Sequence, residues 1–145
     1  MKKHANIFQT AATILDFGDQ GIFDPIHASR CFNINFSGTK NEMTNQLYNF
    51  FGSHRKIVDI KDGCIKFDLN HSIKSFLDYH NISDISTNHG TSEHVFNQHS
   101  FFEAMHLVTN VGGHMFNVLN CQGWADGNGY GHGFYLYHPK FINLL

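Results

Sequence analysis

The chain has 145 residues, of which 41% are hydrophobic and 14% aromatic, and a formal net charge of −2. This length fits one domain, residues 1–145, with its own buried core, while the slightly acidic balance argues against a nucleic-acid binder, which usually presents a basic face. No segment reaches the roughly 18 apolar residues of a membrane span, and three scattered cysteines without a CxxC pair favour reduced thiols, so we predict a cytoplasmic protein with neither nucleic acid nor membrane as a partner.

Short apolar, partly β-branched runs alternate along the chain with segments whose apolar residues share one helical face. In chain order, the sequence predicts a strand at 12–17, a helix at 41–51, strands at 55–60 and 64–69, a short helix through 70–79, a strand at 84–88, a helix at 93–108, a strand at 114–119 and a helix at 139–145. Glycines predict a turn at 18–21, helix ends at 52 and 112–113, and a loop at 123–133. Residues 25–40 show no clear period.

Strands that alternate with helices predict βαβ units and a mostly parallel sheet. We therefore expect an α/β fold, a Rossmann-like doubly wound sheet of about five strands. In such an open sheet, ligands bind beyond the carboxyl ends of the strands. The informative positions are the segments that follow the predicted strands, at 16–21, 59–63, 68–70, 88–94 and 120–132.

Three residues after the first three strands suit a nucleoside ligand. Gly18 lets the backbone approach a ligand closely because it has no Cβ, although an ordinary turn is the alternative. Asp59 can accept hydrogen bonds from ribose hydroxyls, or it can simply close a turn. Asp68 can reach an adenine amino group, or it can cap a turn with Asn70.

The segment 88–94, Asn-His-Gly-Thr-Ser-Glu-His, is the densest in polar groups. Gly90 permits a tight strand-to-helix turn, and Thr91 or Ser92 can cap the helix that follows. Glu93 and His94 then fall in the first helical turn, where the helix dipole favours a carboxylate. They are either residues that stabilise the helix start or an acid and a base that face the cleft.

Histidine is abundant, with 12 residues in the chain. His132 is flanked by glycines, so it either belongs to a substrate site or fixes the geometry of its loop. His89, His94 and His99 are five residues apart, which does not place them on one helical face. An HExxH pattern is also absent, so we predict no metal site, with a metal-dependent hydrolase as a further alternative.

Three segments in the second half of the chain carry a resemblance to a known family. They read Gly-Thr-Ser-Glu-His-Val-Phe-Asn-Gln at 90–98, Gly-Gly at 112–113 and His-Gly-Phe-Tyr at 132–135. These segments resemble the GTxEHxFNQ, GG and HGFY segments of bacterial and phage class I S-adenosylmethionine (SAM)-dependent methyltransferase-like proteins. The resemblance extends over roughly residues 13–145, and its second half is the more specific.

The resemblance implies that SAM binds at the ends of the first strands of a sheet that is truncated relative to the full seven-stranded methyltransferase fold. The residues that it implies for SAM binding are Asp16, Gly18, Asp59, Asp68, Leu69, Asn88 and Gly90. Gly18, Asn88 and Gly90 would lie near the methionine part, Asp59 at the ribose, and Asp68 with Leu69 near the adenine. The transfer site would contain Glu93, His94 and His132.

We therefore predict a SAM-dependent methyltransferase that acts on a small-molecule or glycan acceptor. Methyl transfer mainly needs an aligned acceptor. Where the acceptor is a hydroxyl or a protonated amine, His94 or His132 would take its proton, with Glu93 orienting the histidine. The alternative is a non-catalytic module that binds SAM or a nucleotide. A fifth strand left at the sheet edge would also allow a homo-oligomer that pairs through that edge.

Overall fold

A computed structural model describes residues 5–22, 24–71, 73–119, 133–138 and 140. The strands form one five-stranded sheet in the order β3-β2-β1-β4-β5, and every neighbouring pair is parallel. They are β1 (Thr13–Phe17), β2 (His54–Asp59), β3 (Ile65–Lys66), β4 (Ser83–His89) and β5 (Thr109–Val118). The strand order reverses between β1 and β4, and the predicted Rossmann-like, doubly wound α/β fold is thereby confirmed.

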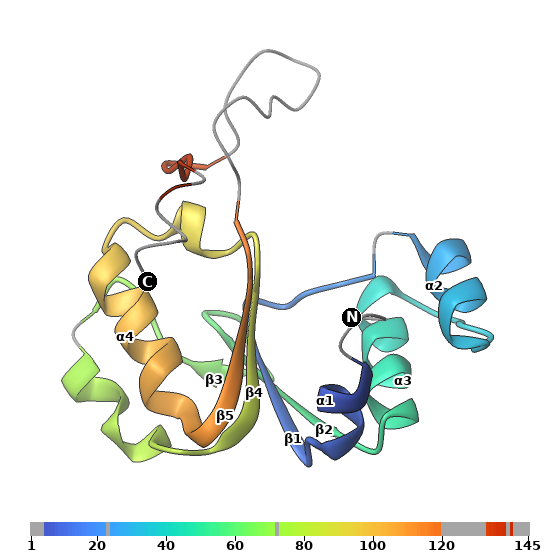
Figure 1. The fold of residues 1–145 in the computed structure, drawn as a ribbon. Coiled ribbons are helices and arrows are strands. Elements are labelled where there is room, and N and C mark those ends of the chain that lie inside the picture. Colours follow the sequence, from blue (N-terminus) through green and yellow to red (C-terminus); the bar gives the residue numbers. More distant parts are fainter. Residues whose placement is uncertain (1–4, 23, 72, 120–132, 139, 141–145) are drawn as a thin grey trace.

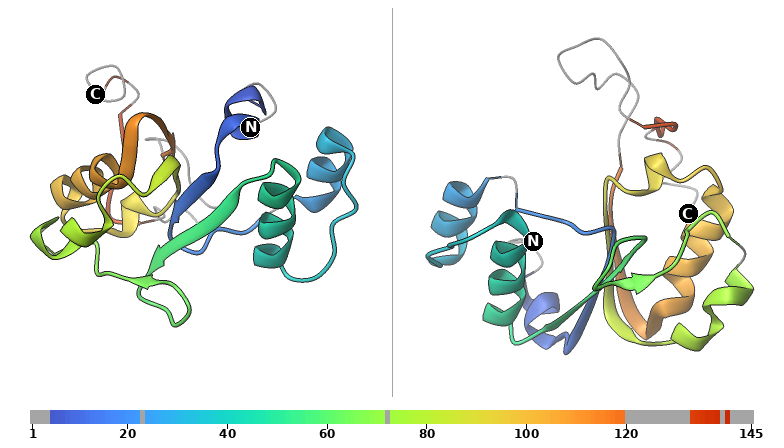
Figure 2. Two further views of the ribbon diagram at one scale, coloured as in Figure 1. Left: turned by 90° about the horizontal axis from the view of Figure 1, so that it is seen from below. Right: turned by 180° about the vertical axis from the view of Figure 1, so that it is seen from behind.

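Helices cover both faces of the sheet (Figure 1). One face carries α1 (Ala5–Thr10), α2 (Pro25–Phe32) and α3 (Lys40–Phe50), and the other carries the 3-10 helix η2 (Ile73–Tyr79) and α4 (Gln98–Val108). A short 3-10 turn, η3 (Ser92–His94), follows β4. The views from below and from behind show the same two layers of helices (Figure 2).

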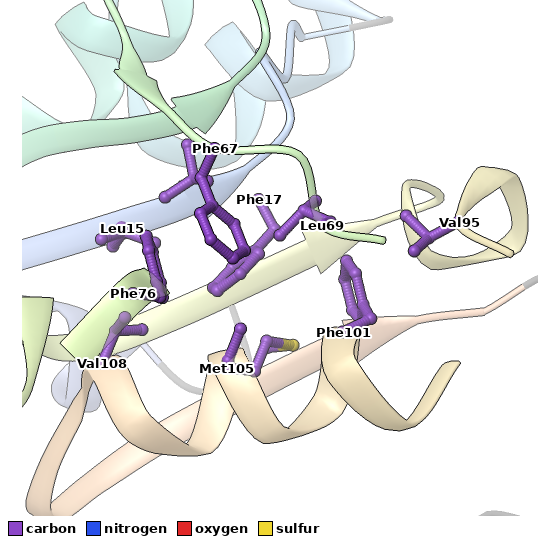
Figure 3. Close-up of a cluster of buried hydrophobic side chains, with 11 residues drawn as sticks. Leu15, Phe17, Phe67, Leu69, Phe76, Val95, Phe101, Met105 and Val108 are labelled. Carbon is purple, nitrogen blue, oxygen red and sulfur yellow. The ribbon is translucent and has the colours of Figure 1, made fainter. Parts of the chain in front are cut away.

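The alternation of side chains along β1 supplies both halves of the core. Leu15 and Phe17 point toward α4 and η2, as Figure 3 shows, and pack with Phe67, Leu69, Phe76, Val95, Phe101, Ala104, Met105 and Val108. Ile14 points to the opposite face and packs with Phe8, Ala11, Leu47, Tyr48, Phe51 and Ile85. A strand that contributes side chains to the core on both faces lies in the middle of the sheet. This position explains the almost continuous apolar sequence of β1.

Local capping signals define the first helices. Before α3, the Thr39 hydroxyl accepts a hydrogen bond from Glu42 N (3.3 Å) and the Glu42 carboxylate accepts one from Thr39 N (2.6 Å), which is a capping box. The ambiguous segment 25–40 contains α2, where the Asp24 carboxylate accepts from His27 N at 2.8 Å. Asp24 followed by Pro25 is a helix-start signal that a search for apolar periodicity misses, and α1 was missed as well.

Three predicted elements have different extents in the structure. The third strand is only two residues long, and the segment before β4 is a 3-10 helix. The predicted helix at 93–108 is divided, because η3 ends at His94 and α4 begins at Gln98. The Asn97 side chain accepts a hydrogen bond from Ser100 N at 3.1 Å, so it caps a new helix after the break.

The two glycines at 112–113 lie inside β5 and do not end the preceding helix. β5 begins at Thr109, directly after α4. From the paired residues Ser83 and Thr109 to the paired residues Ile85 and His114, the chain advances five residues along β5 but only two along β4. Gly112 has φ +81°, and a Cβ on Gly113 would lie 2.8 Å from the Asp84 carbonyl oxygen. Glycine is therefore needed to form this bulge.

Most of the predicted loop at 123–133 and nearly all of the predicted last helix at 139–145 lie outside the described residues. β5 is an edge strand, and no described strand pairs with its outer edge, so pairing of two copies there stays a prediction. Within the described ranges, no helix is both long enough and apolar enough to cross a membrane.

Candidate functional site

A cavity of about 390 Å³, referred to below as the main cavity, lies where the loops after β1, β2, β3 and β4 meet. The predicted site residues that border it are Gly18, Asp59, Asp68, Leu69 and His94. These residues come from four separate segments of the chain, and the parallel sheet brings them together because the carboxyl ends of its strands share one edge.

The loops after β1 and β4 are joined directly above the end of β1. The Thr91 hydroxyl donates to the Phe17 carbonyl oxygen and accepts from Gln20 Nε2, each at 2.7 Å. This contact is referred to below as the Gln20–Thr91 bridge. Gly18 has φ +82°, and a Cβ there would overlap Thr91 Oγ1 and lie 2.9 Å from Gln20 Nε2. Only glycine therefore fits beneath the bridge.

We expect Gly18→Ala to destabilise the fold by about 1–3 kcal/mol, because alanine is strained at this φ and its Cβ collides with the bridge. Gly63→Ala is a matched control, since Gly63 has φ +81° and open space around its Cβ position. Urea unfolding of both variants should show the larger loss for Gly18→Ala. Equal losses of stability in the two variants would mean that the Gln20–Thr91 bridge shifts to accommodate the added Cβ without a cost in free energy.

Asp59 fixes the loop after β1 and also faces the main cavity. Its Oδ2 accepts from Asp19 N at 3.0 Å and its Oδ1 accepts from Ile60 N at 2.7 Å. Lys61 Nζ lies 4.0 Å from Oδ2. A carboxylate has about four acceptor positions, so Asp59 keeps capacity for a ligand hydroxyl while it holds the loop.

Asp68 forms a turn with Asn70. This turn was the alternative to an adenine contact in the interpretation of the sequence. Its Oδ1 accepts from Asn70 N (2.9 Å) and Asn70 Nδ2 (3.0 Å), and these two hydrogen bonds lower the pKa of Asp68. Asn70 Oδ1 accepts in turn from Phe96 N at 2.8 Å and Asn97 N at 3.1 Å. This side of the main cavity is thus tied to the start of α4, and Leu69 packs into the core beneath it.

Asn88 and Gly90 shape the turn after β4 and do not border the main cavity. Asn88 is buried, and its Oδ1 accepts from Thr91 N (3.0 Å) and Ser92 N (3.1 Å). It therefore caps η3, a role that the sequence assigned to Thr91 or Ser92. Gly90 has φ +81°, and a Cβ there would lie 2.9 Å from Glu93 Oε1.

Glu93 is only 1% exposed and packs against the C-terminal segment. Its carbonyl oxygen accepts from Phe134 N at 2.6 Å and Tyr135 N at 3.3 Å, and a Cβ on Gly133 would lie 2.7 Å from Glu93 Cγ. The described part of the His-Gly-Phe-Tyr segment thus contacts the Gly-Thr-Ser-Glu-His turn. His132 itself lies outside the described residues.

Asp16 is fully buried on the α3 side of the sheet and does not border the main cavity. Its carboxylate accepts from Tyr48 Oη (3.0 Å), Arg55 Nε (2.7 Å) and the Thr87 hydroxyl. Arg55 also donates to the Gln20 carbonyl oxygen at 2.7 Å. Asp16 therefore positions Arg55, and Arg55 in turn holds the loop after β1 through its hydrogen bond to Gln20. Arg55 was not predicted as a site residue, because its only sequence signal is a charge at the start of the predicted strand 55–60.

Metal-ligating side chains are dispersed over the part of the chain that the structure describes. There, no three His, Cys, Asp or Glu side chains are grouped so that they could hold a metal ion. Burial, with the negative charges of Asp19 and Asp59 nearby, raises the pKa of the Cys64 thiol. Cys64 is therefore protonated near neutral pH and is a poor nucleophile.

The site is a crevice with a glycine, two carboxylates and a histidine on its wall. It lies at the point where the strand order reverses, which is where open α/β sheets bind ligands. No family model, curated protein or solved structure matches the chain.

Proposed function

We propose that the chain binds SAM in the main cavity and transfers its methyl group to a small-molecule or glycan acceptor. The observation that supports this proposal is the presence of Gly18, Asp59 and Asp68 on the wall of one cavity. The resemblance of segments 90–98 and 132–135 to methyltransferase-like proteins supports it as well, and the described parts of these segments contact each other at Glu93.

In this proposal, each part of SAM meets a group of suitable chemistry. The backbone at Gly18 lies beside the methionine part, and Asp59 accepts hydrogen bonds from the ribose hydroxyls. Asp68 and Leu69 border the adenine. Ile60, which is 75% exposed and also borders the cavity, offers an apolar surface to the flat base.

SAM supplies a methyl group on a positively charged sulfur, so the protein mainly has to align the acceptor and exclude water. His94 borders the main cavity. We test His94 and His132 as bases with the single variants His94→Ala and His132→Ala. Full turnover by both variants would exclude these two histidines from that role.

We expect Asp59→Asn to weaken SAM binding about 10-fold to 100-fold, since a hydrogen bond to a charged group contributes about 1.5–3 kcal/mol. Titration calorimetry with SAM measures the loss. The control is Asp62→Asn, because the Asp62 side chain is 94% exposed and pairs with Lys66 outside the cavity. If Asp59→Asn binds SAM as tightly as the wild-type chain, Asp59 does not hold the ribose.

One observation favours the second candidate, a module that binds SAM or a nucleotide without turnover. Glu93, the predicted acid, is buried under Gly133 and does not border the main cavity. Calorimetry combined with a tritiated-methyl transfer screen over sugars, small acids and proteins distinguishes the two. SAM binding without transfer to any acceptor supports the module, and transfer supports the enzyme.

A further inference from the structure

The two outer strands of the sheet, β3 and β5, form edges of different character. β3 has only two residues, Ile65–Lys66, and the exposed Lys66 side chain forms an ion pair with the carboxylate of Asp62. A short strand with a charged side chain is a common means of preventing another strand from pairing with an edge. The β3 edge is therefore protected against further pairing.

The β5 edge has little of this protection. β5 is the longest described strand, with ten residues, and it contains no Asp, Glu, Lys, Arg or Pro. Its bulge at Gly112 and Gly113 lies in the first half, and from His114 to Val118 the strand follows β4 residue by residue. No described strand pairs with the outer edge of β5. The regular stretch 114–118, referred to below as the β5 edge segment, is therefore suited to pair with a further strand.

Apolar side chains flank the β5 edge segment on both faces of the sheet. Met115 borders a cavity together with Leu107 of α4, so it lies on the α4 face, and it is 47% exposed. Val118 lies on the opposite face, because it is three residues further along the strand, and it is 56% exposed. A strand that extends the sheet would cover part of both side chains, since neighbours on the same face of paired strands pack together.

A second copy of the chain fits this edge. A two-fold axis perpendicular to the sheet makes the two β5 edge segments antiparallel, so each copy offers the other an equally long, regular stretch with apolar side chains on both faces. Neither segment brings a Lys, Arg, Asp or Glu that would face a like charge. The joined sheet then ends at β3 on both sides, so the protected edges stop the assembly at two copies.

We propose that two copies of the chain form a symmetric dimer in which their β5 edge segments pair as antiparallel strands and join the two sheets into one. Backbone hydrogen bonds between the segments hold the copies together, and Met115 and Val118 of each copy pack against the partner strand. The inference does not depend on the proposed function, because the pairing needs no ligand.

The first test is sedimentation equilibrium of the full chain over a range of concentrations. We expect the average mass to rise from that of one chain, 16.5 kDa, to twice that value as the concentration increases, and to rise no further. A chain that stays monomeric at every concentration would overturn the inference. Assemblies that keep growing beyond two copies would overturn it as well, because pairing through β5 leaves only protected edges.

The second test places a charge on the edge, as Lys66 does at β3. We expect Val118→Lys and Met115→Lys each to weaken dimerisation about 10-fold or more, because the two added ammonium groups of each dimer lie close to the interface and oppose pairing. Ile26→Lys is the control, since Ile26 is a 65% exposed side chain on α2, and it should leave the dimer unchanged. Circular dichroism confirms that the variants are folded. If either edge variant dimerises as tightly as the wild-type chain, the inference is wrong.

Hydrogen exchange locates the interface without any substitution. We expect amides of the β5 edge segment to exchange more slowly at concentrations where the wild-type chain is dimeric than where it is monomeric, whereas amides of α3 should not change. Exchange of the segment that is the same in monomer and dimer would overturn the inference, because the two copies would then associate through another surface.

Discussion

Replacing Arg55 by alanine should lower the free energy of unfolding by about 3–5 kcal/mol, because it leaves the carboxylate of Asp16 buried without its counter-charge. The side chain of Arg55 is 5% exposed and that of Asp16 is 0% exposed, and their atoms Nε and Oδ2 are 2.7 Å apart. Arg55→Ala also removes the hydrogen bond to the Gln20 carbonyl oxygen. Unfolding in guanidinium chloride measures the loss.

Two further variants separate the buried pair from ordinary surface charge. Lys66→Ala breaks an exposed ion pair with Asp62 and should change stability by no more than about 0.5–1 kcal/mol. The double variant Asp16→Ala, Arg55→Ala should lose less than the sum of its two single variants, because neither charge is then left alone. Strictly additive losses would mean that the two side chains do not stabilise each other.

Replacing Phe101 by alanine should cost about 3–5 kcal/mol, the usual range for removing a buried aromatic ring. Phe101 lies on α4 and is fully buried, with its ring centroid 5.3 Å from that of Phe17 (Figure 3). The ring fastens α4 to the end of β1, directly below Gly18. Thermal and chemical unfolding should therefore show a large loss of stability, and titration calorimetry should show weaker binding of SAM, the ligand proposed for the main cavity.

Phe96→Ala provides the comparison for Phe101→Ala within the same segment of the chain. The Phe96 side chain is 73% exposed, and its backbone N–H keeps its bond to Asn70 Oδ1 in the variant. We expect a change within about 0.5 kcal/mol. A loss similar to that of Phe101→Ala would contradict the exposure of the Phe96 side chain.

Both β1 and β4 lie where the sequence predicts strands, although apolar residues mark β1 much more strongly than β4. β1 is apolar along most of its length, as expected for a strand with both faces covered. β4 reads Ser-Asp-Ile-Ser-Thr-Asn-His, with a single aliphatic residue, yet it pairs on both sides. Its buried polar side chains form hydrogen bonds within the fold, as Thr87 does with Asp16 and Asn88 with Ser92, and hydropathy does not report such partners.

The convergence of the strand-end loops was predictable from the sequence, whereas the partners of single side chains were not. The alternation along β1 already places Asp16 on the face opposite to Phe17, and therefore away from the main cavity. Its partner Arg55 lies 39 residues away and becomes a neighbour only through the pairing of β1 with β2. The position of His89 beside Tyr48 likewise depends on how α3 packs on the sheet.

The Gln20–Thr91 bridge depends in part on one flexible side chain, that of Gln20. Swinging Gln20 aside breaks its hydrogen bonds to Phe17 and Thr91, which costs roughly 1–3 kcal/mol at 0.5–1.5 kcal/mol each. The main chain beneath can stay in place, because Gly18 N remains bonded to the Val58 carbonyl oxygen at 2.8 Å. A rotamer change of Gln20 alone would thus break this half of the bridge, on a timescale far shorter than any loop rearrangement.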